Sequence, residues 1–460
     1  MTGVDGVAAV DLCGDRVCML RLGTVTVDKS GSSGVPDAEL PAGPVFWRVR
    51  AGATMSATWE FFVGSAHVPA DLTWGATLDV DGDGIPDVAA GASASVAVWL
   101  GGLGFGAMPV MLANPDAPGA KFGYVVAAAG DLDGDGYGEL AVGECGSGGG
   151  KVHVYFGAPG GALGRVQALS APDNLTGFGC RLTAAGDLDG DGYGDLVIAR
   201  TGDDFGGGIY VVRGAASGKL AVGARIDSPD YKPSRLGYSL AGVGDLDGDG
   251  FADLVATEID ASAASGRAHV YRGGPDGITN ARQTTIQSPD PSGLQFGASV
   301  AGVGDVDGDG YPDFVVAAPA VSTTTLAPAA HLYRGGPSGL MVTPTTLATD
   351  GSPGFATEVE PAGDVDGDGL SDVLVTATDS VVLFRGAGAG IIPAGTLTAA
   401  GQGVNPRHAA GAGDLDRDGH ADVLVADGAG VEVLFGTGSG LARTRAVTLT
   451  PPGGSTGSVN

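Results

Sequence analysis

The stretch DLDGDGYGD at residues 187–195 places three aspartates at alternate positions, glycines at its fourth and sixth positions, and a fourth aspartate at its end. Carboxylates crowded in this way raise one another's pKa unless a cation lies among them. The pattern occurs seven times, beginning at Asp79, Asp131, Asp187, Asp245, Asp305, Asp364 and Asp414. We call these segments acidic loops 1 to 7 and number their residues from position 1 to position 9. Their regular spacing of 50–60 residues indicates an array of structural repeats.

The composition is typical of a folded, turn-rich chain built from β-strands. The 460 residues include 85 glycines and 26 prolines, yet 43% are hydrophobic and only 17% are charged. Runs of the helix-forming residues Glu, Lys, Leu and Gln are nearly absent. The net charge of −29 argues against a nucleic-acid groove or an anionic membrane surface as a partner. We therefore expect an all-β fold with no nucleic-acid partner.

Each repeat contains four short segments with the character of β-strands. A small-residue segment such as SLAGVGD precedes the acidic loop, and a β-branched segment such as DLVIA follows it. A third segment ends in a glycine turn, as in HVYRGGPDG, and a fourth, more polar segment leads to the next repeat. Four strands in about 55 residues describe one propeller blade, so the repeats predict a seven-bladed β-propeller.

The predicted propeller spans residues 74–450. Its blades cover approximately residues 74–115, 121–172, 177–229, 235–289, 295–348, 354–398 and 404–450. The segment ARTRAVTLT gives blade 7 its own fourth strand, so closure of the ring need not borrow a strand, and the mode of closure stays open. We expect residues 451–460, which are rich in Gly and Ser, to form a flexible tail.

Residues 1–70 lack the repeat. The segment VFWRVRAGATMSATWEFFVGS contains two alternating apolar strands and resembles the last two strands of a fibronectin-III-like or immunoglobulin-like sandwich. We expect a partial β-sandwich-like region here, the alternative being a small β-appendage packed on the propeller. The first residues show no basic segment followed by an apolar run, so no signal peptide is predicted.

An uncharged stretch at residues 88–115 is long enough to span a bilayer but is not expected to do so. It is interrupted by five glycines and a proline at Gly91, Gly101, Gly102, Gly104, Gly106 and Pro109. It also occupies the place that short strands take in the other repeats. We therefore predict no transmembrane segment.

Four cysteines bear on the compartment. Cys13 and Cys18 are five residues apart, with no CxxC motif and no cluster of zinc-binding spacing, which favours a disulfide. Cys145 and Cys180 are either a second disulfide or two small buried thiols. A disulfide fits an extracellular, cell-surface or periplasmic location.

The first residues of each repeat complete a family resemblance. Aromatic–glycine pairs stand at Trp74-Gly75, Phe122-Gly123, Phe178-Gly179 and Phe296-Gly297, with Leu236-Gly237 and Phe355-Ala356 as variants. Together with the DxDGDGxxD loops and triplets such as Ala317-Ala318-Pro319, they resemble FG-GAP repeats over residues 74–450. FG-GAP repeats are the calcium-binding blades of integrin α-subunit propellers and of many bacterial surface proteins. The sequence departs from the pattern at Glu139, at Pro406-Arg407 and at Arg417.

The acidic loops are candidate calcium sites. Ca²⁺ takes about six to eight oxygen ligands, and positions 1, 3, 5 and 9 supply carboxylates while position 7 supplies a main-chain carbonyl. An EF-hand would need a glutamate at position 12, where loop 3 has Ile198 inside a strand pattern. The alternative is a turn rich in Asp and Gly that binds no metal. The candidate ligands are Asp79, Asp81, Asp83, Ile85, Asp87, Asp131, Asp133, Asp135, Tyr137, Glu139, Asp187, Asp189, Asp191, Tyr193, Asp195, Asp245, Asp247, Asp249, Phe251, Asp253, Asp305, Asp307, Asp309, Tyr311, Asp313, Asp364, Asp366, Asp368, Leu370, Asp372, Asp414, Asp416, Asp418, His420 and Asp422.

Up to seven Ca²⁺ ions, one in each loop, are expected to have a structural role. Seven ions would add 14 positive charges and change the net charge from −29 to −15. Arg417 at position 4 of loop 7 replaces a glycine and is expected to strain that turn. Extracellular calcium modules bind the ion at roughly 10⁻⁴–10⁻³ M, which again points to an extracellular, cell-surface or periplasmic location.

The histidines do not form a catalytic constellation. His153, His269 and His331 recur at the repeat position that Tyr210 takes in blade 3, which indicates a packing role. The GxSxG motif at residues 453–457 has no strand-to-helix elbow around it. We therefore predict a non-enzymatic, monomeric propeller for recognition or adhesion, with a protein or glycan ligand. The alternatives are a carbohydrate-binding lectin propeller and a non-catalytic module of a larger secreted hydrolase.

Overall fold

The computed structural model describes the propeller from residue 77 to residue 449, and again at Thr456–Val459. Short gaps in this description lie at residues 93, 103–104, 106–107, 117–120, 147–148, 174–175, 202–206, 230–233, 261–265, 290–294, 321–326, 348–353, 379, 389, 399–407 and 427–429. In the N-terminal region it describes the backbone of five strands: β1 (Ala8–Cys13), β2 (Arg21–Val27), β3 (Gly43–Ala51), β4 (Thr54–Met55) and β5 (Trp59–Val63).

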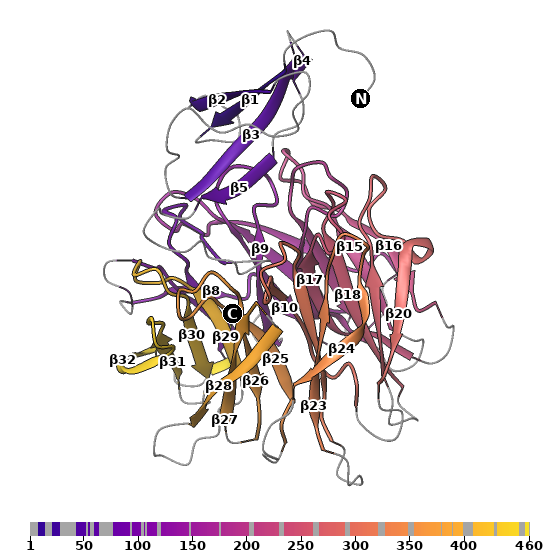
Figure 1. Ribbon diagram of the computed structural model, residues 1–460. Coiled ribbons are helices and arrows are strands. Elements are labelled where there is room, and N and C mark those ends of the chain that lie inside the picture. The colour runs from indigo at the N-terminus through magenta and orange to yellow at the C-terminus, as the bar shows by residue number, and fades with distance from the viewer. Residues whose placement is uncertain are drawn as a thin grey trace.

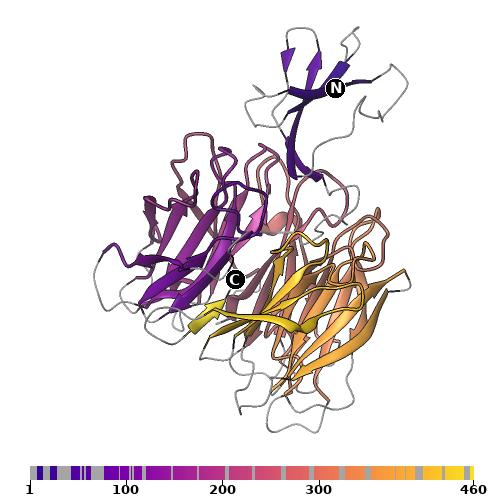
Figure 2. The same cartoon turned by 90° about the vertical axis from the view of Figure 1, so that its left-hand side faces the viewer.

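Seven four-stranded antiparallel sheets confirm the predicted propeller. They follow one another in chain order around the molecule, so that the yellow C-terminal strands return beside the purple strands of the first blades (Figures 1 and 2). From the inner to the outer strand, blade 1 contains β33 (Thr456–Val459), β6 (Val88–Ala92), β7 (Ser95–Trp99) and β8 (Val110–Ala113). Blade 2 contains β9 (Phe122–Gly130), β10 (Glu139–Glu144), β11 (Lys151–Phe156) and β12 (Arg165–Leu169). Blade 3 contains β13 (Phe178–Gly186), β14 (Asp195–Arg200), β15 (Gly208–Val212) and β16 (Val222–Asp227). Blade 4 contains β17 (Ser234–Gly244), β18 (Asp253–Asp260), β19 (Gly266–Tyr271) and β20 (Gln283–Gln287), preceded by the 3-10 helix η1 (Asn280–Arg282); blade 5 contains β21 (Val300–Gly304), β22 (Asp313–Ala318), β23 (Ala329–Arg334) and β24 (Met341–Leu347); blade 6 contains β25 (Glu358–Gly363), β26 (Asp372–Thr376), β27 (Ser380–Ala387) and β28 (Gly390–Thr398); and blade 7 contains β29 (His408–Gly413), β30 (Asp422–Ala426), β31 (Val431–Phe435) and β32 (Ala442–Leu449).

The burial of each strand follows its composition. The second strands, such as β14 and β22, are buried along their whole length because neighbouring blades cover both faces of the sheet. The outer strand β24 is mostly exposed, in keeping with its Thr-rich sequence. Each core cluster draws on two adjacent blades, as where Val154 of blade 2 packs with Ile198 of blade 3. The hydrophobic core is therefore distributed among the interfaces between blades.

The aromatic residues of the FG pairs at Phe122 and Phe296 pack in the cores between neighbouring blades. Phe122 and Phe296 are fully buried, and their rings contact those of His153 and His331 at centroid distances of 5.5 and 5.8 Å. The glycine that follows is needed for close approach: Gly123 has a φ of 76°, and a Cβ there would lie 2.8 Å from a main-chain oxygen of blade 1. The pairs Trp74-Gly75 and Pro406-Arg407 lie outside the described residues.

Strand β33 closes blade 1, which corrects the prediction of a flexible tail for residues 456–459; the rest of residues 451–460 lies outside the described residues. Strand β33 pairs antiparallel with β6, with Thr456 opposite Ala92 and Val459 opposite Ala90. In the other six blades, the strand before the acidic loop takes this inner place. Before Asp79, the described chain has only an isolated bridge at Leu78. Pairing with β33 covers the inner edge of β6, whose N–H and C=O groups would otherwise lack partners.

The uncharged stretch at residues 88–115 contains the three strands β6, β7 and β8. Among the residues that the structure describes, no helix has the length and apolar character needed to cross a membrane. The rejection of a transmembrane helix at this stretch is therefore confirmed.

The N-terminal strands form one sheet in the order β2-β1-β3-β4, and β5 also pairs with β3. The two alternating apolar segments of the sequence are β3 and β5, which pair antiparallel with Trp47 opposite Trp59. The resemblance to a sandwich domain stays a prediction. Cys18 lies outside the described residues, so the Cys13–Cys18 disulfide also stays a prediction.

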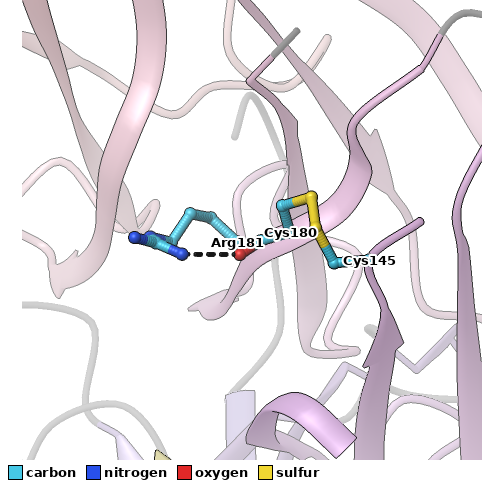
Figure 3. The surroundings of a disulfide bond; sticks show 3 residues. All are labelled: Cys145, Cys180 and Arg181. Atoms are coloured by element: carbon cyan, nitrogen blue, oxygen red, sulfur yellow. Dashed lines mark hydrogen bonds between the residues drawn. A yellow bond between two sulfur atoms is a disulfide. The ribbon is translucent and has the colours of Figure 1, made fainter. Parts of the chain in front are cut away.

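Cys145 and Cys180 form a disulfide, which decides between the two alternatives for this pair. The bond joins the residue after β10 in blade 2 to the inner strand β13 of blade 3 (Figure 3). The Arg181 guanidinium donates a hydrogen bond to the Cys180 main-chain oxygen at 2.9 Å (Figure 3). The disulfide is thus a covalent link between two neighbouring blades, and it closes a chain segment with a sequence separation of 35.

Candidate metal centres

The acidic loops gather at one end of the propeller. In blades 2 to 7, each loop joins the inner strand to the second strand, and loop 1 leads into β6 of blade 1. Because strands at equivalent positions run in the same direction in every blade, all seven loops lie on the same face. We call this face the loop face.

The carboxylate at position 1 builds the turn through main-chain hydrogen bonds. In loop 3, Asp187 Oδ1 accepts from the N–H groups of Gly190 and Asp191 at 2.7 and 3.1 Å, and Oδ2 accepts from Gly192 at 2.7 Å. Asp191 Oδ1 in turn accepts from the Tyr193 N–H at 3.0 Å. Gly190 and Gly192 have φ angles of 75° and 90°, as expected for these positions. The loop therefore holds its shape through its own carboxylates.

An aspartate at position 9 connects its loop to the main chain at the end of the third strand. Asp195 is buried; its Oδ2 accepts from the Leu188 N–H at 3.1 Å and its Oδ1 from the Gly214 N–H at 3.0 Å. All six loops with an aspartate at this position share both bonds. In loop 2, Glu139 Oε2 accepts from the Leu132 N–H at 2.5 Å, but the buried Oε1 has no hydrogen-bond partner. The glutamate therefore lacks one of the two main-chain hydrogen bonds that the aspartates of the other loops accept.

The structure brings together side chains that the sequence places within nine residues. In loops 1, 2 and 3, one carboxylate oxygen from each of positions 1, 3 and 9 lies within 4.8 Å of the others. In loop 4 the corresponding group is formed by positions 1, 3 and 5. The carbonyls at position 7 stay predicted ligands: they belong to Ile85, Tyr137, Tyr193, Phe251, Tyr311, Leu370 and His420.

Buried oxygens without hydrogen bonds show that a hard cation fits these clusters. The Oδ1 atoms at position 3 of loops 2, 4, 5 and 6 are buried and accept no hydrogen bond; they belong to Asp133, Asp247, Asp307 and Asp366. Buried polar atoms are almost always satisfied in native proteins, so these four equivalent oxygens are suited to one common kind of ligand. Ca²⁺ prefers oxygen ligands of this kind and would satisfy them.

The electrostatics of the clusters favour the same conclusion. Burial, supported by the charges at positions 1 and 3, raises the pKa at position 9 far above the ordinary value of an acid side chain. The pKa rises to about 7 at Asp87, Asp195, Asp253, Asp313 and Asp372, to about 8 at Asp422 and to about 9 at Glu139. Without a cation, these groups bind protons near neutral pH. A divalent cation would restore the ionised form by its opposite charge.

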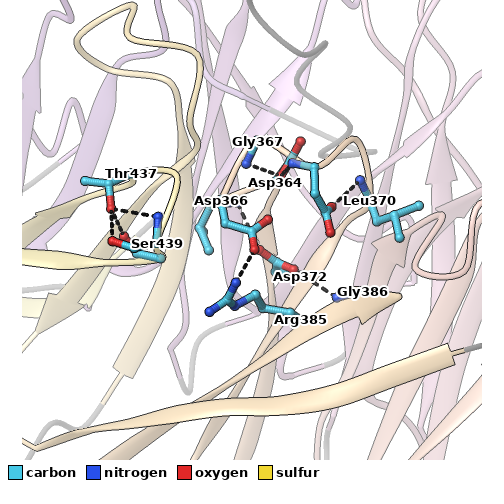
Figure 4. Close-up of polar contacts among 12 residues, drawn as sticks. Asp364, Asp366, Gly367, Leu370, Asp372, Arg385, Gly386, Thr437 and Ser439 are labelled. Carbon is cyan, nitrogen blue, oxygen red and sulfur yellow. Dashed lines mark hydrogen bonds and ion pairs between the residues drawn. The ribbon is translucent and has the colours of Figure 1, made fainter. Parts of the chain in front are cut away.

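Arginines complete the sites, and sequence reasoning missed them. In loop 6, Arg385 forms an ion pair with Asp366 Oδ2, and the neighbouring Gly386 N–H donates to Asp372 Oδ1 at 2.9 Å (Figure 4). The equivalent pairs are Arg213–Asp189 at 2.8 Å, Arg272–Asp247 at 3.0 Å and Arg334–Asp307 at 3.2 Å. The signal in the sequence is an arginine directly before the turn glycine, as in VVRG, VYRG, LYRG and LFRG.

Blade 2 reaches the same arrangement by another route. Phe156 stands where blades 3 to 6 have the arginine, and Arg165 comes instead from the outer strand β12. Arg165 lies over the Phe156 ring with its Cζ 3.6 Å from the centroid, and it pairs with Asp133 at 2.5 Å. Five successive loops therefore hold a guanidinium against the carboxylate at position 3.

The acidic loops also connect neighbouring blades. The carbonyl of Leu188 at position 2 of loop 3 accepts a hydrogen bond at 2.9 Å from the N–H of Gly274, in the turn after β19 of blade 4. The corresponding bond recurs at every interface between blades, and the Gly102 N–H closes the ring by donating to Leu415 of loop 7 at 3.4 Å. A cation in a loop would therefore stiffen both its own blade and the interface with the next blade.

Arg417 gives loop 7 its individual character. Its φ of 58° lies in the left-handed region, which costs a side-chain-bearing residue roughly 1 kcal/mol and confirms the expected strain. Its guanidinium donates to the Asp83 main-chain oxygen of loop 1 at 2.6 Å. Asp414 still accepts from the Asp418 and Gly419 N–H groups at 3.0 and 2.9 Å. Loop 7 thus keeps the turn of the other loops and adds a contact across the junction between blades 7 and 1.

Curated proteins that resemble this chain are integrin α-subunits. Integrin alpha-V of Gallus gallus is 34% identical over 152 residues, which cover 30% of this chain and 14% of the relative. Integrin alpha-7 of Rattus norvegicus is 32% identical over 177 residues, covering 37% of this chain and 14% of the relative. The match therefore spans about a seventh of the length of these relatives.

Among solved structures, the periplasmic gluconolactonase of Pseudomonas aeruginosa matches 81% of this chain and 98% of its own chain, with a TM-score of 0.50 and 17% identity. At that identity the likeness concerns the fold alone.

The profile of the FG-GAP-like repeat matches residues 79–142, 131–198, 187–256, 245–316 and 364–425. Each matched window begins at the first aspartate of an acidic loop. Because these windows together cover more than half of the sequence, the chain belongs to the FG-GAP-like repeat family.

Proposed function

We propose that this chain is a calcium-stabilised propeller that acts outside the cytoplasm in recognition or adhesion. The observation that carries the calcium part is the recurrence of a buried carboxylate oxygen without a hydrogen-bond partner at position 3 of four loops. The carboxylates at positions 1, 3 and 9 hold the ion, with positions 5 and 7 as the further ligands. The ion supplies charge neutralisation for the loops and has no part in a reaction.

The structural role of the ions follows from where the loops stand. Loops 1 and 3 to 7 bond through position 9 to the end of the third strand of their own blade, and every loop bonds through position 2 to the next blade. Neutralising the carboxylates removes a repulsion located at the interfaces between blades. Each site would stabilise the folded state by about 2.7 kcal/mol at a hundredfold excess of calcium over the dissociation constant.

Recognition is supported by the kind of relatives that the chain has. The relatives are integrin α-subunits, and the chain itself belongs to the FG-GAP-like repeat family. The fold itself is shared with a gluconolactonase and so does not decide between binding and catalysis. We propose a binding role without enzymatic activity, for a protein or glycan ligand.

The extracytoplasmic location rests on two features. The Cys145–Cys180 disulfide suits an oxidising compartment. Extracellular calcium modules bind the ion at roughly 10⁻⁴–10⁻³ M, which suits structural ions of the kind proposed here. An extracellular, cell-surface or periplasmic location satisfies both conditions.

Thermal melting with calcium and with a chelator tests the calcium part, together with ion counting by atomic emission. We expect several bound ions and a large fall in the melting temperature on chelation. An unchanged melting temperature with no bound calcium would refute it. For recognition, arrays of extracellular proteins and glycans are probed with calcium-loaded protein, and binding only to a sugar class would favour the lectin alternative.

A further inference from the structure

A cavity of about 540 Å³ lies beside acidic loop 1, where blade 1 meets loop 7. We call it the seam cavity. Its wall includes Asp81, Asp83, Trp99, Leu100, Met108 and Arg417. The cavity combines carboxylates of a candidate metal loop with apolar side chains of β7 and of the segment before β8.

The position beside an acidic loop is occupied by an arginine of the chain itself in blades 2 to 6. In blade 4, Arg272 pairs with Asp247 at 3.0 Å and extends under the turn glycine of the next blade, Gly339. A Cβ on Gly339 would lie 2.5 Å from the guanidinium of Arg272. The carboxylate at position 3 thus has one oxygen for a metal ion and one for a guanidinium.

Blade 1 has the same architecture but lacks the cation. Leu100 stands directly before the turn glycine, where Arg272 stands in blade 4. It also lies under the equivalent glycine of the next blade, because a Cβ on Gly161 would be 2.7 Å from a Leu100 methyl group. The leucine therefore follows the path of the arginines and ends short of the carboxylate.

The alternative source of a cation, used by blade 2, is also missing. There, Arg165 of the outer strand lies opposite Phe156. In blade 1, Val98 pairs with Val110, and continuing this antiparallel register places Leu100 opposite Met108. Met108 thus takes the place of Arg165, and 86% of its surface is exposed.

As a result, Asp81 has no ion pair like those at position 3 of loops 2 to 6. In the described part of the chain, no arginine or lysine forms an ion pair with Asp81. Arg417 reaches the cavity, but its guanidinium donates to the main-chain oxygen of Asp83 and not to a carboxylate. In blades 2 to 6, an arginine of the chain itself fills the space beside the carboxylate at position 3. In blade 1, this space is an open cavity.

We propose that the seam cavity binds an arginine side chain of a partner protein. Its guanidinium pairs with Asp81 as Arg272 pairs with Asp247, and its methylene groups pack between Trp99 and Met108. Arginine is favoured over lysine because its planar fork donates two parallel hydrogen bonds to a carboxylate and packs on apolar and aromatic surfaces. The proposal rests on the recognition function and assigns to it a site on the loop face and the chemistry of a partner.

Blocked tripeptides provide the test, measured by calorimetric titration of the full chain in saturating calcium. Gly-Arg-Gly is compared with Gly-Lys-Gly and with Gly-citrulline-Gly, which keeps the shape of arginine and lacks its charge. We expect the arginine peptide to bind at least about tenfold more tightly than the other two. Trp99 lines the cavity, so binding also changes tryptophan fluorescence.

Two variants fill the cavity from within. Leu100→Arg restores the internal arginine of blades 3 to 6, and Met108→Arg restores the arrangement of blade 2; Met108 is exposed, so its replacement does not disturb the core. Both variants should lose the arginine peptide. Val342→Arg, at a residue of β24 that is 59% exposed, adds the same charge far along the chain and should bind as the unmodified protein does.

Equal binding of the arginine and citrulline peptides would overturn the proposal, as would unchanged binding in a folded Met108→Arg variant. The recognition function is judged separately by the protein and glycan arrays. A partner found there whose binding is insensitive to Leu100→Arg and Met108→Arg would refute the seam cavity and leave recognition intact. Failure of both the arrays and the peptides would refute both.

Discussion

Glu139→Asp should strengthen cation binding at acidic loop 2. Glu139 is fully buried, and its Oε1 has no hydrogen-bond partner, whereas both oxygens of the equivalent aspartates accept main-chain hydrogen bonds. Burial raises the pKa of Glu139 to about 9, compared with about 7 for Asp195 in loop 3. An aspartate would draw the carboxylate back to the place where the Leu132 and Gly157 N–H groups can both reach it.

Competition between protons and the cation changes the binding free energy more than the altered hydrogen bonding and packing of the side chain do. At pH 7.4, a carboxyl with a pKa of about 9 loses about 40-fold of its cation affinity to protonation, whereas one with a pKa of about 7 loses less than about twofold. The exchange is therefore worth about 30-fold in affinity, or about 2 kcal/mol. A gained hydrogen bond of about 1 kcal/mol and a lost buried methylene of about 0.8 kcal/mol nearly cancel.

Ion counting after dialysis against limiting calcium checks this prediction at pH 7.4 and at pH 9.5. The variant should hold more calcium than the unmodified protein at the lower pH, and the difference should vanish at the higher pH. Asp195→Glu is the reciprocal control, because it copies loop 2 into loop 3 and should lower calcium binding at pH 7.4. If Glu139→Asp binds no more calcium than the unmodified protein at pH 7.4, the assignment of position 9 as a ligand is wrong.

Three further predictions concern stability. In the presence of a chelator, unfolding by urea should become easier as the pH rises from about 4 to about 7. The pKa of Asp372 is about 7 in the folded state and 3.8 ordinarily, so the folded state binds more protons than the unfolded state in this range. A urea midpoint higher at pH 8 than at pH 5 would contradict this. Replacing Cys145 and Cys180 together by alanine should lower the free energy of unfolding by about 4 kcal/mol, because the bond closes a segment with a sequence separation of 35. A reductant should destabilise the unmodified protein by breaking this bond, whereas the variant has no such bond to lose. Deleting residues 456–460 should lower the melting temperature because β6 loses its inner partner, whereas deleting Asn460 alone should not; equal melting of both truncated chains would show that β33 does not close the ring.

The fold class and the candidate sites could be predicted because their signals are local. All carboxylates of one metal centre lie within nine residues, so the spacing of Asp187, Asp189 and Asp195 reveals the cluster before any folding is considered. The strands are equally local, since runs such as DLVIA carry their β-branched residues next to one another. One copy of this pattern would be a weak signal, but seven copies at regular spacing predict a propeller.

Other features depend on residues that are far apart in the sequence. Strand β33 has a Gly- and Ser-rich sequence with little β-propensity, and it forms a strand because β6 offers an unpaired edge. Arg165 replaces the missing arginine of blade 2 only because β12 runs beside β11. No periodicity in the sequence indicates either pairing.

The sequence by itself determined the seven acidic loops and the four strands of most blades, because backbone turns and strand propensities act over a few neighbouring residues. Only the tertiary structure decided how the ring closes, which oxygens stay without hydrogen bonds, and where a cation is missing. The lack of an arginine ion pair at Asp81 has meaning only because Arg213, Arg272 and Arg385 form that pair in other blades. Burial and the pairing of charges depend on contacts between residues that are far apart in the sequence, and these contacts form only when the blades pack against one another.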